Sequence, residues 1–433
     1  MSAVRAGWAC VLAVCAGAGC RRSRGAPVDG EVPPGDAVVA APMPAGETPA
    51  IAPTRPAEGS QPRWRDLTHG VRPRGQERWR YDFTPRTPHG EPATDGRTVF
   101  VSAVRMEVEG PTDGEVFAFD LRDGTLRWHA AVGGLHGEPL AMVDGLVLVD
   151  TIPHCARRGA DTPGVVQRGC MEPGPGGLVG LDARDGTVRF RTAFTSESLR
   201  ARWSGAMVDG AWWMHDGTVA LRGVRLPTGA PGARLAMPGA VTTLTAIDHD
   251  LIYTLDARPA TRLAVRSPSQ PRARWEKALP YRGTCPVVVA GPLLVVPAFA
   301  SSGVTGAPRA VLRATGADAW SVPSPPHTVE GCGALDGSVY WQVQDLELQG
   351  FAVGDGRRRG RWPLPSPPTS DLAAALDGVF YVSLPRRLAG IDEADGHVAV
   401  EVVTEAAAAE GMVLCAGHGA VVTRDPGLVV GFD

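Results

Sequence analysis

The 433-residue sequence lacks several features that would point to particular functions. Its formal net charge is −3, with 43 basic against 46 acidic residues, so no basic surface for nucleic acid is expected. No stretch reaches the ~18 consecutive apolar residues that a membrane-spanning helix needs. Aromatic residues make up only 6% of the chain, whereas glycine (54) and proline (39) are plentiful. This balance favours many short strands joined by tight turns over long helices.

Recognisable catalytic motifs are missing as well. The ten histidines do not fall at H-x-x-x-H or comparable zinc spacings. No G-x-S-x-G nucleophile turn and no glycine-rich phosphate-binding loop occurs. We therefore predict no catalytic residue, no metal ligand and no bound cofactor.

Residues 1–20 have the pattern of an export signal. Arg5 supplies a positive start, and Ala6 to Gly19 form an apolar run of mostly small residues. The run ends in "AGAGC", which resembles the lipobox of bacterial lipoproteins, although Gly17 stands where that family most often has leucine. The resemblance implies a lipid attached to Cys20. The alternative is a plain secretory peptide that is cleaved nearby.

Residues 21–62 form a segment rich in proline, alanine and glycine that contains no aromatic residue. Such a composition cannot bury enough apolar surface to offset the cost of ordering the backbone. We interpret it as a disordered tether that precedes a folded domain spanning residues 63–433.

A turn followed by a β-rich run recurs about every 40 residues through this domain. The runs are apolar or alternate between apolar and polar residues, as in strands, and lack the spacing of 3 and 4 that helices show. The pattern predicts an all-β fold, an eight-bladed β-propeller with four-stranded antiparallel blades. The copies are centred on Asp95, Asp144, Asp209, His249, Ala290, Asp336, Asp377 and His418.

A second turn appears later in each unit and is clearest in "AFDLRDGTLRW", with Ala118, Asp120, Asp123, Gly124 and Trp128. In an Asp-Gly turn the glycine takes the positive φ, and the earlier aspartate accepts backbone N–H bonds. The aromatic residue on the following strand can then cover the gap to the next blade. Aspartates repeated in this way are typical of turns rather than metal sites. Further copies contain Asp182, Gly186 and Phe190, then Thr315, Gly316 and Trp320, then Asp392 and Gly396.

The sequence ends in "GLVVGFD", where Asp433 occupies the place of Asp120. The glycine and aromatic residue that should follow are found instead near the start of the domain, in "GQERW", as Gly75 and Trp79. We therefore expect the N-terminal strand to form the outer edge of the last blade. That pairing would close the ring and remove free sheet edges.

The second turn resembles the tryptophan-docking motif, A-x-D-x-x-T-G-K-x-x-W, of propellers related to pyrroloquinoline quinone (PQQ) enzymes. Ala118, Asp120, Gly124 and Trp128 match it, while Asp123 and Thr125 replace its threonine and lysine. With the lipobox, the layout is similar to the propeller lipoproteins of the outer-membrane β-barrel assembly machinery. This resemblance implies a monomeric, non-catalytic scaffold at the outer membrane, facing the periplasm or the cell surface. Proteins of the cell envelope would be its partners, and the lipid would be its only membrane contact.

The alternative function is small-molecule binding or quinone-dependent oxidation in the central funnel of the propeller. Quinoprotein dehydrogenases carry a metal site of Glu, Asn and Asp together with a pair of adjacent cysteines. This sequence has no asparagine and no adjacent cysteines, so that ligand set cannot be placed. Trp212 and Trp213 could line such a funnel or belong to the core. Envelope sensing or polymer binding is not separated from the scaffold function by these observations.

The cysteines are compatible with an oxidising compartment. Cys155 and Cys170 flank an insertion, and a disulfide there would close a loop of about 15 residues and stabilise the fold by about 3 kcal/mol. The alternative is two free thiols on a loop. Cys285 and Cys332 could pair or stay as buried thiols, which leaves Cys415 without a partner.

Overall fold

A computed structural model describes most of the repeat domain, and all strand statements below refer to these residues. They are residues 74–105, 114–132, 137–151, 176–194, 205–215, 220–257, 260–270, 272–279, 287–296, 308–322, 329–335, 338–343, 347–366, 374–376, 378–404, 409–415, 418–424 and 427–433. Cys20, Cys155, Cys170 and Cys285 lie outside them, as do the expected signal and tether segments. Within the described part, the chain has 32 strands, no helix and hence no helix that could cross a membrane.

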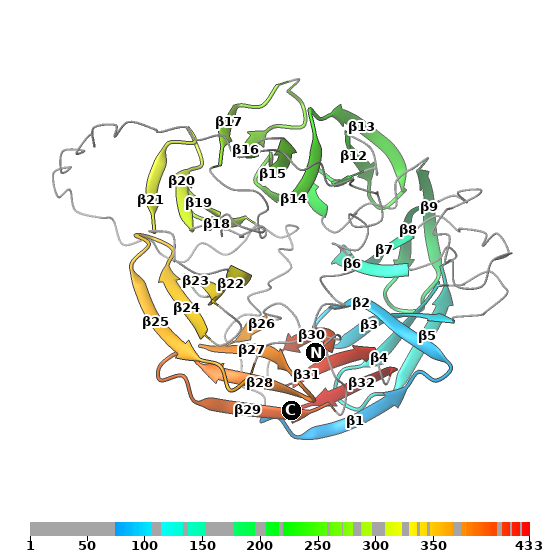
Figure 1. The fold of residues 1–433 in the computed structure, drawn as a ribbon. Helices are drawn as coiled ribbons and strands as arrows, with labels where there is room; N and C mark the ends of the chain where they lie inside the picture. The colour runs from blue at the N-terminus through cyan, green and yellow to red at the C-terminus, as the bar shows by residue number, and fades with distance from the viewer. Residues whose placement is uncertain are drawn as a thin grey trace, which may run out of the picture. The chain divides into compact units, whose positions relative to one another are not determined.

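These strands form eight antiparallel sheets of four strands each (Figure 1). One sheet contains β1 (Glu77–Asp82), β32 (Gly427–Phe432), β31 (His418–Arg424) and β30 (Ala409–Cys415). The others follow the chain: β2 (Arg86–Thr94), β3 (Thr98–Arg105), β4 (Gly114–Asp120) and β5 (Leu126–Ala131); β6 (Gly137–Val143), β7 (Leu146–Thr151), β8 (Gly176–Asp182) and β9 (Val188–Phe194); β10 (Gly205–Val208), β11 (Ala211–His215), β12 (Ala220–Arg225) and β13 (Ala230–Ala236); β14 (Ala240–Ile247), β15 (Asp250–Ala257), β16 (Ala260–Arg266) and β17 (Trp275–Ala278); β18 (Val288–Ala290), β19 (Leu293–Val296), β20 (Arg309–Leu312) and β21 (Asp318–Ser321); β22 (Val329–Leu335), β23 (Ser338–Val343), β24 (Glu347–Ala352) and β25 (Arg358–Pro363); β26 (Ala374–Leu376), β27 (Val379–Leu384), β28 (Arg387–Asp392) and β29 (Val398–Val403).

Both kinds of predicted turn lie at the same end of each sheet, which we call the turn end. The turn between the first two strands is hydrogen-bonded to the turn between the last two. Leu121 N donates to Arg97 O in one sheet, and Ala183 N donates to Gly145 O in the next, both at a donor–acceptor distance of 2.8–2.9 Å. The connections between second and third strands, and between successive sheets, leave from the opposite end. The insertion at residues 152–175 is one of them and lies outside the described residues.

The first-to-second turns adopt the positive backbone angles that their sequences require. At Asp144-Gly145 the φ angles are 48° and 76°, which suits a tight hairpin. Three predicted turn positions differ from the turn that the structure shows. His418 is the first residue of β31 and pairs with Cys415, so the chain turns before it. The other two positions lie one residue away from the turn. β14 and β15 are joined at Asp248-His249, where Asp248 has a φ of 52°, and β18 and β19 are joined through Gly291, with a φ of 55°. These copies lack an Asp-Gly pair, so the sequence pattern did not mark the turning residue.

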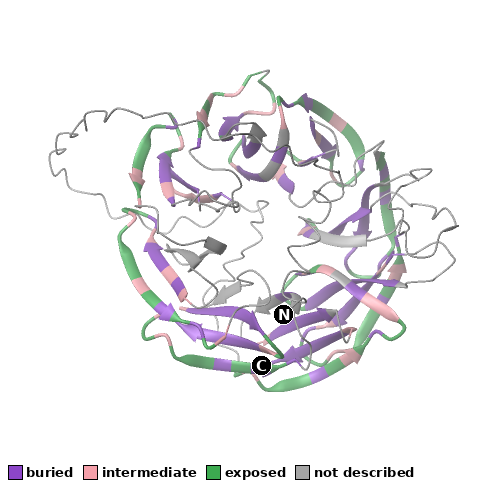
Figure 2. Ribbon diagram, in the orientation of Figure 1, coloured by how far each residue is buried: buried purple, intermediate pink, exposed green. Residues whose placement is uncertain are grey.

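Apolar residues lie mainly on the inner strands, while exposed residues follow the fourth strand of each sheet (Figure 2). Each hydrophobic cluster joins successive sheets: seven clusters join two sheets, and the cluster that contains Ile252, Leu294 and Phe351 joins three. One cluster combines Trp128 of β5 with Val149 of β7, and another combines Phe380 of β27 with Trp362 of β25. The same holds for every successive pair of sheets, and a further cluster joins the sheet of β1 and β30–β32 to that of β2–β5. Burial between sheets is therefore the main source of cohesion.

Trp212 and Trp213 on β11 belong to this core and do not line a funnel. Both are nearly fully buried. Because neighbouring side chains on a strand point to opposite faces, Trp212 packs in the cluster shared with β6–β9, and Trp213 packs in the cluster shared with β14–β17. The two indoles therefore tie one sheet to both of its neighbours.

The N-terminal strand pairs with the last strand of the chain. β1 and β32 are antiparallel, with Arg80 opposite Val430 and Asp82 opposite Leu428. Figure 1 shows β1 along the outer edge of β32. The register shifts beside Trp79, and the corresponding shift occurs beside Trp128 in the pairing of β4 with β5. Two distant parts of the sequence thus build the same outer hairpin geometry that other sheets build from adjacent strands.

Candidate functional site

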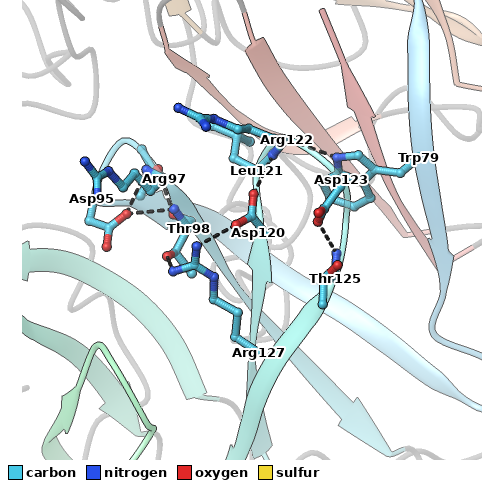
Figure 3. A network of polar contacts seen from close by, with 11 residues as sticks. Trp79, Asp95, Arg97, Thr98, Asp120, Leu121, Arg122, Asp123, Thr125 and Arg127 are labelled. Atoms are coloured by element: carbon cyan, nitrogen blue, oxygen red, sulfur yellow. Dashed lines mark hydrogen bonds and ion pairs between the residues drawn. The ribbon is translucent and has the colours of Figure 1, made fainter.

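The turn after β4 contains a network of polar contacts (Figure 3). The carboxylate of Asp120 accepts the Arg122 amide at 2.9 Å, and that of Asp123 accepts the Thr125 amide at 2.9 Å. Gly124 has a φ of 73°, which L side chains rarely adopt, and its amide donates to Asp120 O. The aspartates therefore hold the turn together by accepting backbone N–H bonds.

An arginine on the next strand completes this network. Arg127 donates to the second carboxylate oxygen of Asp120 at 2.5 Å and to the Thr98 hydroxyl at 3.0 Å. The Arg122 amide, followed by Arg127, lowers the pKa of Asp120 below its ordinary value. The next sheet repeats the arrangement more tightly: Arg184, with help from Arg189, holds the pKa of Asp182 well below its usual range. These carboxylates stay charged and are engaged within the fold.

The aromatic residue of each unit reaches the turn of the next sheet. Trp128 lies opposite Ala118 and donates its indole N–H to Ala183 O at 3.0 Å. Its ring covers Gly186, where an added Cβ would be only 2.6 Å from the ring. The glycine thus serves both the turn and the close approach of the indole. Phe190 covers Gly229 in the same way, but without a hydrogen bond from its ring.

Three further copies show the same contact. In each, an indole N–H donates to the carbonyl three residues before a glycine of positive φ. The pairs are Trp275 with Arg313, Trp320 with Val353 and Trp362 with Glu393, at 2.8, 2.8 and 2.9 Å. The glycines are Gly316, Gly356 and Gly396. Trp275 lies in the sheet that precedes the sheet of Gly316. A search for the motif within single repeat units therefore misses this pairing.

The turns that receive these indoles differ in their polar residue. Thr315 replaces the second aspartate, and its hydroxyl accepts the Ala317 amide at 3.2 Å. Asp392 keeps the first aspartate and accepts the Ala394 amide at 2.8 Å. Both side chains stabilise the turn by accepting a backbone amide, one through a hydroxyl group and the other through a carboxylate.

The two ends of the described chain assemble one more copy of this turn. Asp433 and Gln76 exchange backbone hydrogen bonds: Asp433 N donates to Gln76 O at 3.1 Å, as Asp120 N donates to Thr125 O at 2.8 Å, and Gln76 N donates to Asp433 O at 3.2 Å. Arg78 forms an ion pair with Asp433 and lowers the pKa of that carboxyl group. Trp79 donates to Leu121 O at 3.0 Å and covers Gly124.

Gly75 supplies the glycine of this composite turn, with a φ of 81°. An added Cβ at Gly75 would be 3.0 Å from the side chain of Val400, which stands where other units have an aromatic residue. The smaller valine therefore occupies the docking position at this junction.

A second junction also lacks an aromatic docking residue. β13 carries no aromatic residue towards β14–β17, and the sheets are joined instead by a large apolar cluster that includes Trp213 and Tyr253. At the turn end, His249 Nδ1 lies 2.5 Å from a carboxylate oxygen of Asp209. This contact raises the pKa of His249 and favours its charged form.

Within the described part of the chain, no group of three His, Cys, Asp or Glu side chains is placed to hold a metal ion. The recurring acids are used in turns and in ion pairs across strands. The arrangement can therefore hold successive sheets rigidly together. It presents a dense set of short, charged turns at one end of the sheets.

Comparison with known proteins gives one family and one fold. The family model described as "Outer membrane protein assembly factor BamB" matches residues 69–358. BamB from Moraxella catarrhalis aligns with a TM-score of 0.56 at 12% identity, covering 83% of this chain and 97% of that one. A europium-containing methanol dehydrogenase aligns at 0.52 and 11%, over 84% and 88%, and Sqt1 from Saccharomyces cerevisiae at 0.56 and 8%, over 83% and 99%. Identities this low show a shared β-propeller fold and do not select a function. No curated protein sequence matches the chain.

Proposed function

Because the chain belongs to the family of the outer membrane protein assembly factor BamB, we propose that it is a non-catalytic, protein-binding scaffold of the cell envelope that takes part in outer-membrane protein assembly. The family match over residues 69–358 carries this proposal. The rigid inter-sheet contacts support it, since loops and turns held on a stable framework are suited to recognition.

The scaffold that we propose is a closed, monomeric ring of eight blades. Two observations support it: each sheet shares an apolar cluster with the next, and the pairing of β1 with β32 links the two ends of the series. In a closed ring, each blade keeps two edge strands, the innermost beside the central channel and the outermost at the rim. Sedimentation at several protein concentrations tests the monomer, and a concentration-dependent mass would contradict it.

We propose that the protein is exported and anchored to the outer membrane through a lipid on Cys20, with residues 21–62 as a tether to the propeller. The lipobox-like "AGAGC" supports this assignment. Metabolic labelling with a tagged fatty acid should mark the native protein and not the Cys20→Ala variant. Label retained in that variant would contradict the anchor, and would leave the scaffold function to be judged separately.

The scaffold function is tested by capture of partners from cells. A crosslinkable residue placed at the exposed Arg122 of the turn end should join the protein to an outer-membrane assembly factor. The same crosslinker on an unrelated exported lipoprotein is the control. The scaffold proposal is wrong if the probe at Arg122 and probes at other loops recover only the proteins that the control also recovers.

The absence of catalysis is part of the same proposal. The sequence has no asparagine with which to build the metal site of quinoprotein dehydrogenases, and the recurring aspartates are engaged in turns. Metal analysis and an absorbance scan of the purified protein test this directly. A stoichiometric metal ion or a quinone spectrum would favour the alternative, an oxidoreductase that uses the central funnel.

A further inference from the structure

Three consecutive arginines, Arg357, Arg358 and Arg359, lie at the turn between β24 and β25 and at the start of β25. All three are exposed, and Arg361 follows two residues later on the same strand. Residues 347–363 contain these four arginines and only two acidic residues. The whole chain has a net charge of −3, so this concentration of positive charge is a local feature.

The backbone of this turn matches that of the turn after β4. Ala352 N donates to Arg357 O, and Gly356 N donates to Ala352 O, both at 2.8 Å. After β4, Asp120 takes the place of Ala352 in the corresponding pair of bonds. The position that holds the first aspartate of the turn after β4 is therefore an alanine here.

Arg359 lacks the carboxylate with which its counterparts pair. Three other sheets carry an arginine three residues after the glycine of the turn, and each of these arginines pairs with the first aspartate: Arg127 with Asp120, Arg189 with Asp182 and Arg78 with Asp433. Arg359 occupies the same position, but Ala352 offers no acid. Its ion pair is with Glu393 of the next sheet, where Nη1 and Oε1 are 3.7 Å apart and the arginine side chain is 45% exposed. A contact of this length and exposure contributes little stability.

The acids of the same sheet do not neutralise the other two arginines. Glu347 pairs with Arg361 at 2.6 Å, and the Asp355 carboxylate accepts the Arg357 amide at 2.9 Å. Within the described part of the chain, the guanidinium groups of Arg357 and Arg358 form no ion pair. The repeat does not require an arginine at position 358, because the corresponding residues of three other sheets are Leu126, Val188 and Val398.

The turn that presents these arginines is held by the preceding sheet. Trp320 donates its indole N–H to Val353 O at 2.8 Å. Its ring covers Gly356, where an added Cβ would be 2.5 Å from the ring. The arginines therefore extend from a fixed backbone, which lowers the entropic cost of binding a partner there.

We propose that Arg357, Arg358 and Arg359 bind the carboxylates of an acidic segment of the partner protein. A guanidinium group matches a carboxylate through two parallel N–H···O bonds. The counterparts of Arg359 in three other sheets pair with aspartates of this same chain, so a partner's carboxylate is the group that fits the position. The proposal rests on the scaffold function and specifies the chemistry that the partner must present.

The test is a titration of the purified full-length protein with fluorescent, capped ten-residue peptides, followed by fluorescence anisotropy at low salt. One peptide contains four consecutive glutamates, and the other has glutamines in their place. The glutamate peptide should bind more tightly, and its affinity should fall as salt is added. Arg357→Gln and Arg358→Gln should each weaken its binding by about threefold to fivefold, the range of one exposed charge pair.

Ala352→Asp tests the role of the missing aspartate. The new carboxylate should pair with Arg359 and weaken binding of the glutamate peptide by a similar factor, although no arginine has been removed. Ala352→Asn is the matched control, because it has nearly the same shape without the charge, and it should leave the affinity unchanged. Arg262→Gln controls for net charge: it removes an exposed arginine that pairs with Glu276 in another sheet, and it should also have no effect.

Four results would each overturn the proposal. They are equal binding of the two peptides, native affinity in Arg357→Gln and Arg358→Gln, an equally large effect of Arg262→Gln, and equal affinities of Ala352→Asp and Ala352→Asn. A second probe is glycerophosphoglycerol, the soluble headgroup of an anionic phospholipid. If it displaces the labelled glutamate peptide at a lower concentration than unlabelled glutamate peptide does, the arginines bind a membrane surface and the proposal is wrong.

Failure of this inference and failure of the scaffold function are distinguishable. The peptide titration needs no cell extract, so a loss of charge selectivity is detected even when partner capture through Arg122 succeeds. Conversely, selective binding of the glutamate peptide by a protein that captures no partner would contradict the scaffold function and not the anion site.

Discussion

The pairing of β1 with β32 predicts that two tryptophans far apart in the repeat series are equally important for stability. Trp79 and Trp128 are each 8% exposed, and each donates its indole N–H to a carbonyl of the next sheet at 3.0 Å. Each also covers a glycine, Gly124 or Gly186, with nearly the same positive φ. The perturbation is Trp79→Ala, with Trp128→Ala as its matched control, because only Trp79 depends on the link between the two ends of the described chain.

The expected cost follows from this burial. An indole buries about 150–250 Å², worth about 4–6 kcal/mol at ~25 cal/mol per Å² before the site relaxes. Substitutions of this kind typically cost about 3–5 kcal/mol, and about 1 kcal/mol more is lost where a buried carbonyl is left without its donor. We therefore expect the free energy of unfolding to fall by about 4 kcal/mol in each alanine variant. Trp79→Phe, which keeps a ring as Phe190 does, should cost about half as much.

The assay is urea unfolding followed by far-UV circular dichroism, with the midpoint and slope compared between the variants. The two alanine variants should unfold at similar, lower urea concentrations than the native protein. If Trp128→Ala is destabilised while Trp79→Ala unfolds with the native midpoint, β1 does not contribute to the stability of the last sheet. The closed-ring proposal would then be wrong, while the description of the other sheets would be unaffected.

Three further predictions concern single features of the repeat. The pKa of Asp182 is depressed in the folded state, so its ionised form stabilises the protein above about pH 4, and this contribution is lost as pH falls towards the folded pKa. The difference in melting temperature between the native protein and Asp182→Asn should therefore be constant near neutral pH and shrink in acid. A difference that does not change with pH would contradict this. Gly124→Ala should lower the free energy of unfolding in urea by about 2 kcal/mol more than Gly96→Ala does. Both glycines have a positive φ, but only a Cβ at Gly124 would lie against an indole, 2.5 Å away. Equal losses would contradict the close approach of the indole. If Cys155 and Cys170 form a disulfide, the reduced protein should take up two more alkyl groups than the unreduced protein. An equal mass of the two alkylated samples would indicate free thiols.

Local chemistry explains why much of the repeat could be predicted from the sequence. Aspartate followed by glycine marks a turn because the carboxylate accepts nearby amides and glycine takes a positive φ without strain. Both depend on residues within a few positions, as Asp120 and Gly124 show. Where this chemistry is absent, as at Asp248-His249, the pattern placed the turn one residue away.

Contacts between sheets were harder to predict. Trp275 docks on the turn of Gly316 although its own unit has no recognisable motif, and Trp362 reaches Glu393 from two residues further along its strand. These contacts depend on the distance between neighbouring sheets, which no single repeat encodes.

The sequence by itself determined the all-β class, the period of the units and the residues that turn the chain, because each of these depends on short-range spacing and on backbone angles. It also indicated that Asp433 matches the first part of the docking motif, and that Gly75 and Trp79 match its second part. Only the tertiary structure decided that these parts meet: Asp433 bonds to Gln76 and Arg78, and Trp79 reaches Leu121. The physical reason is that pairing across the whole domain is favourable only once the intervening sheets bring the two strands within hydrogen-bonding distance.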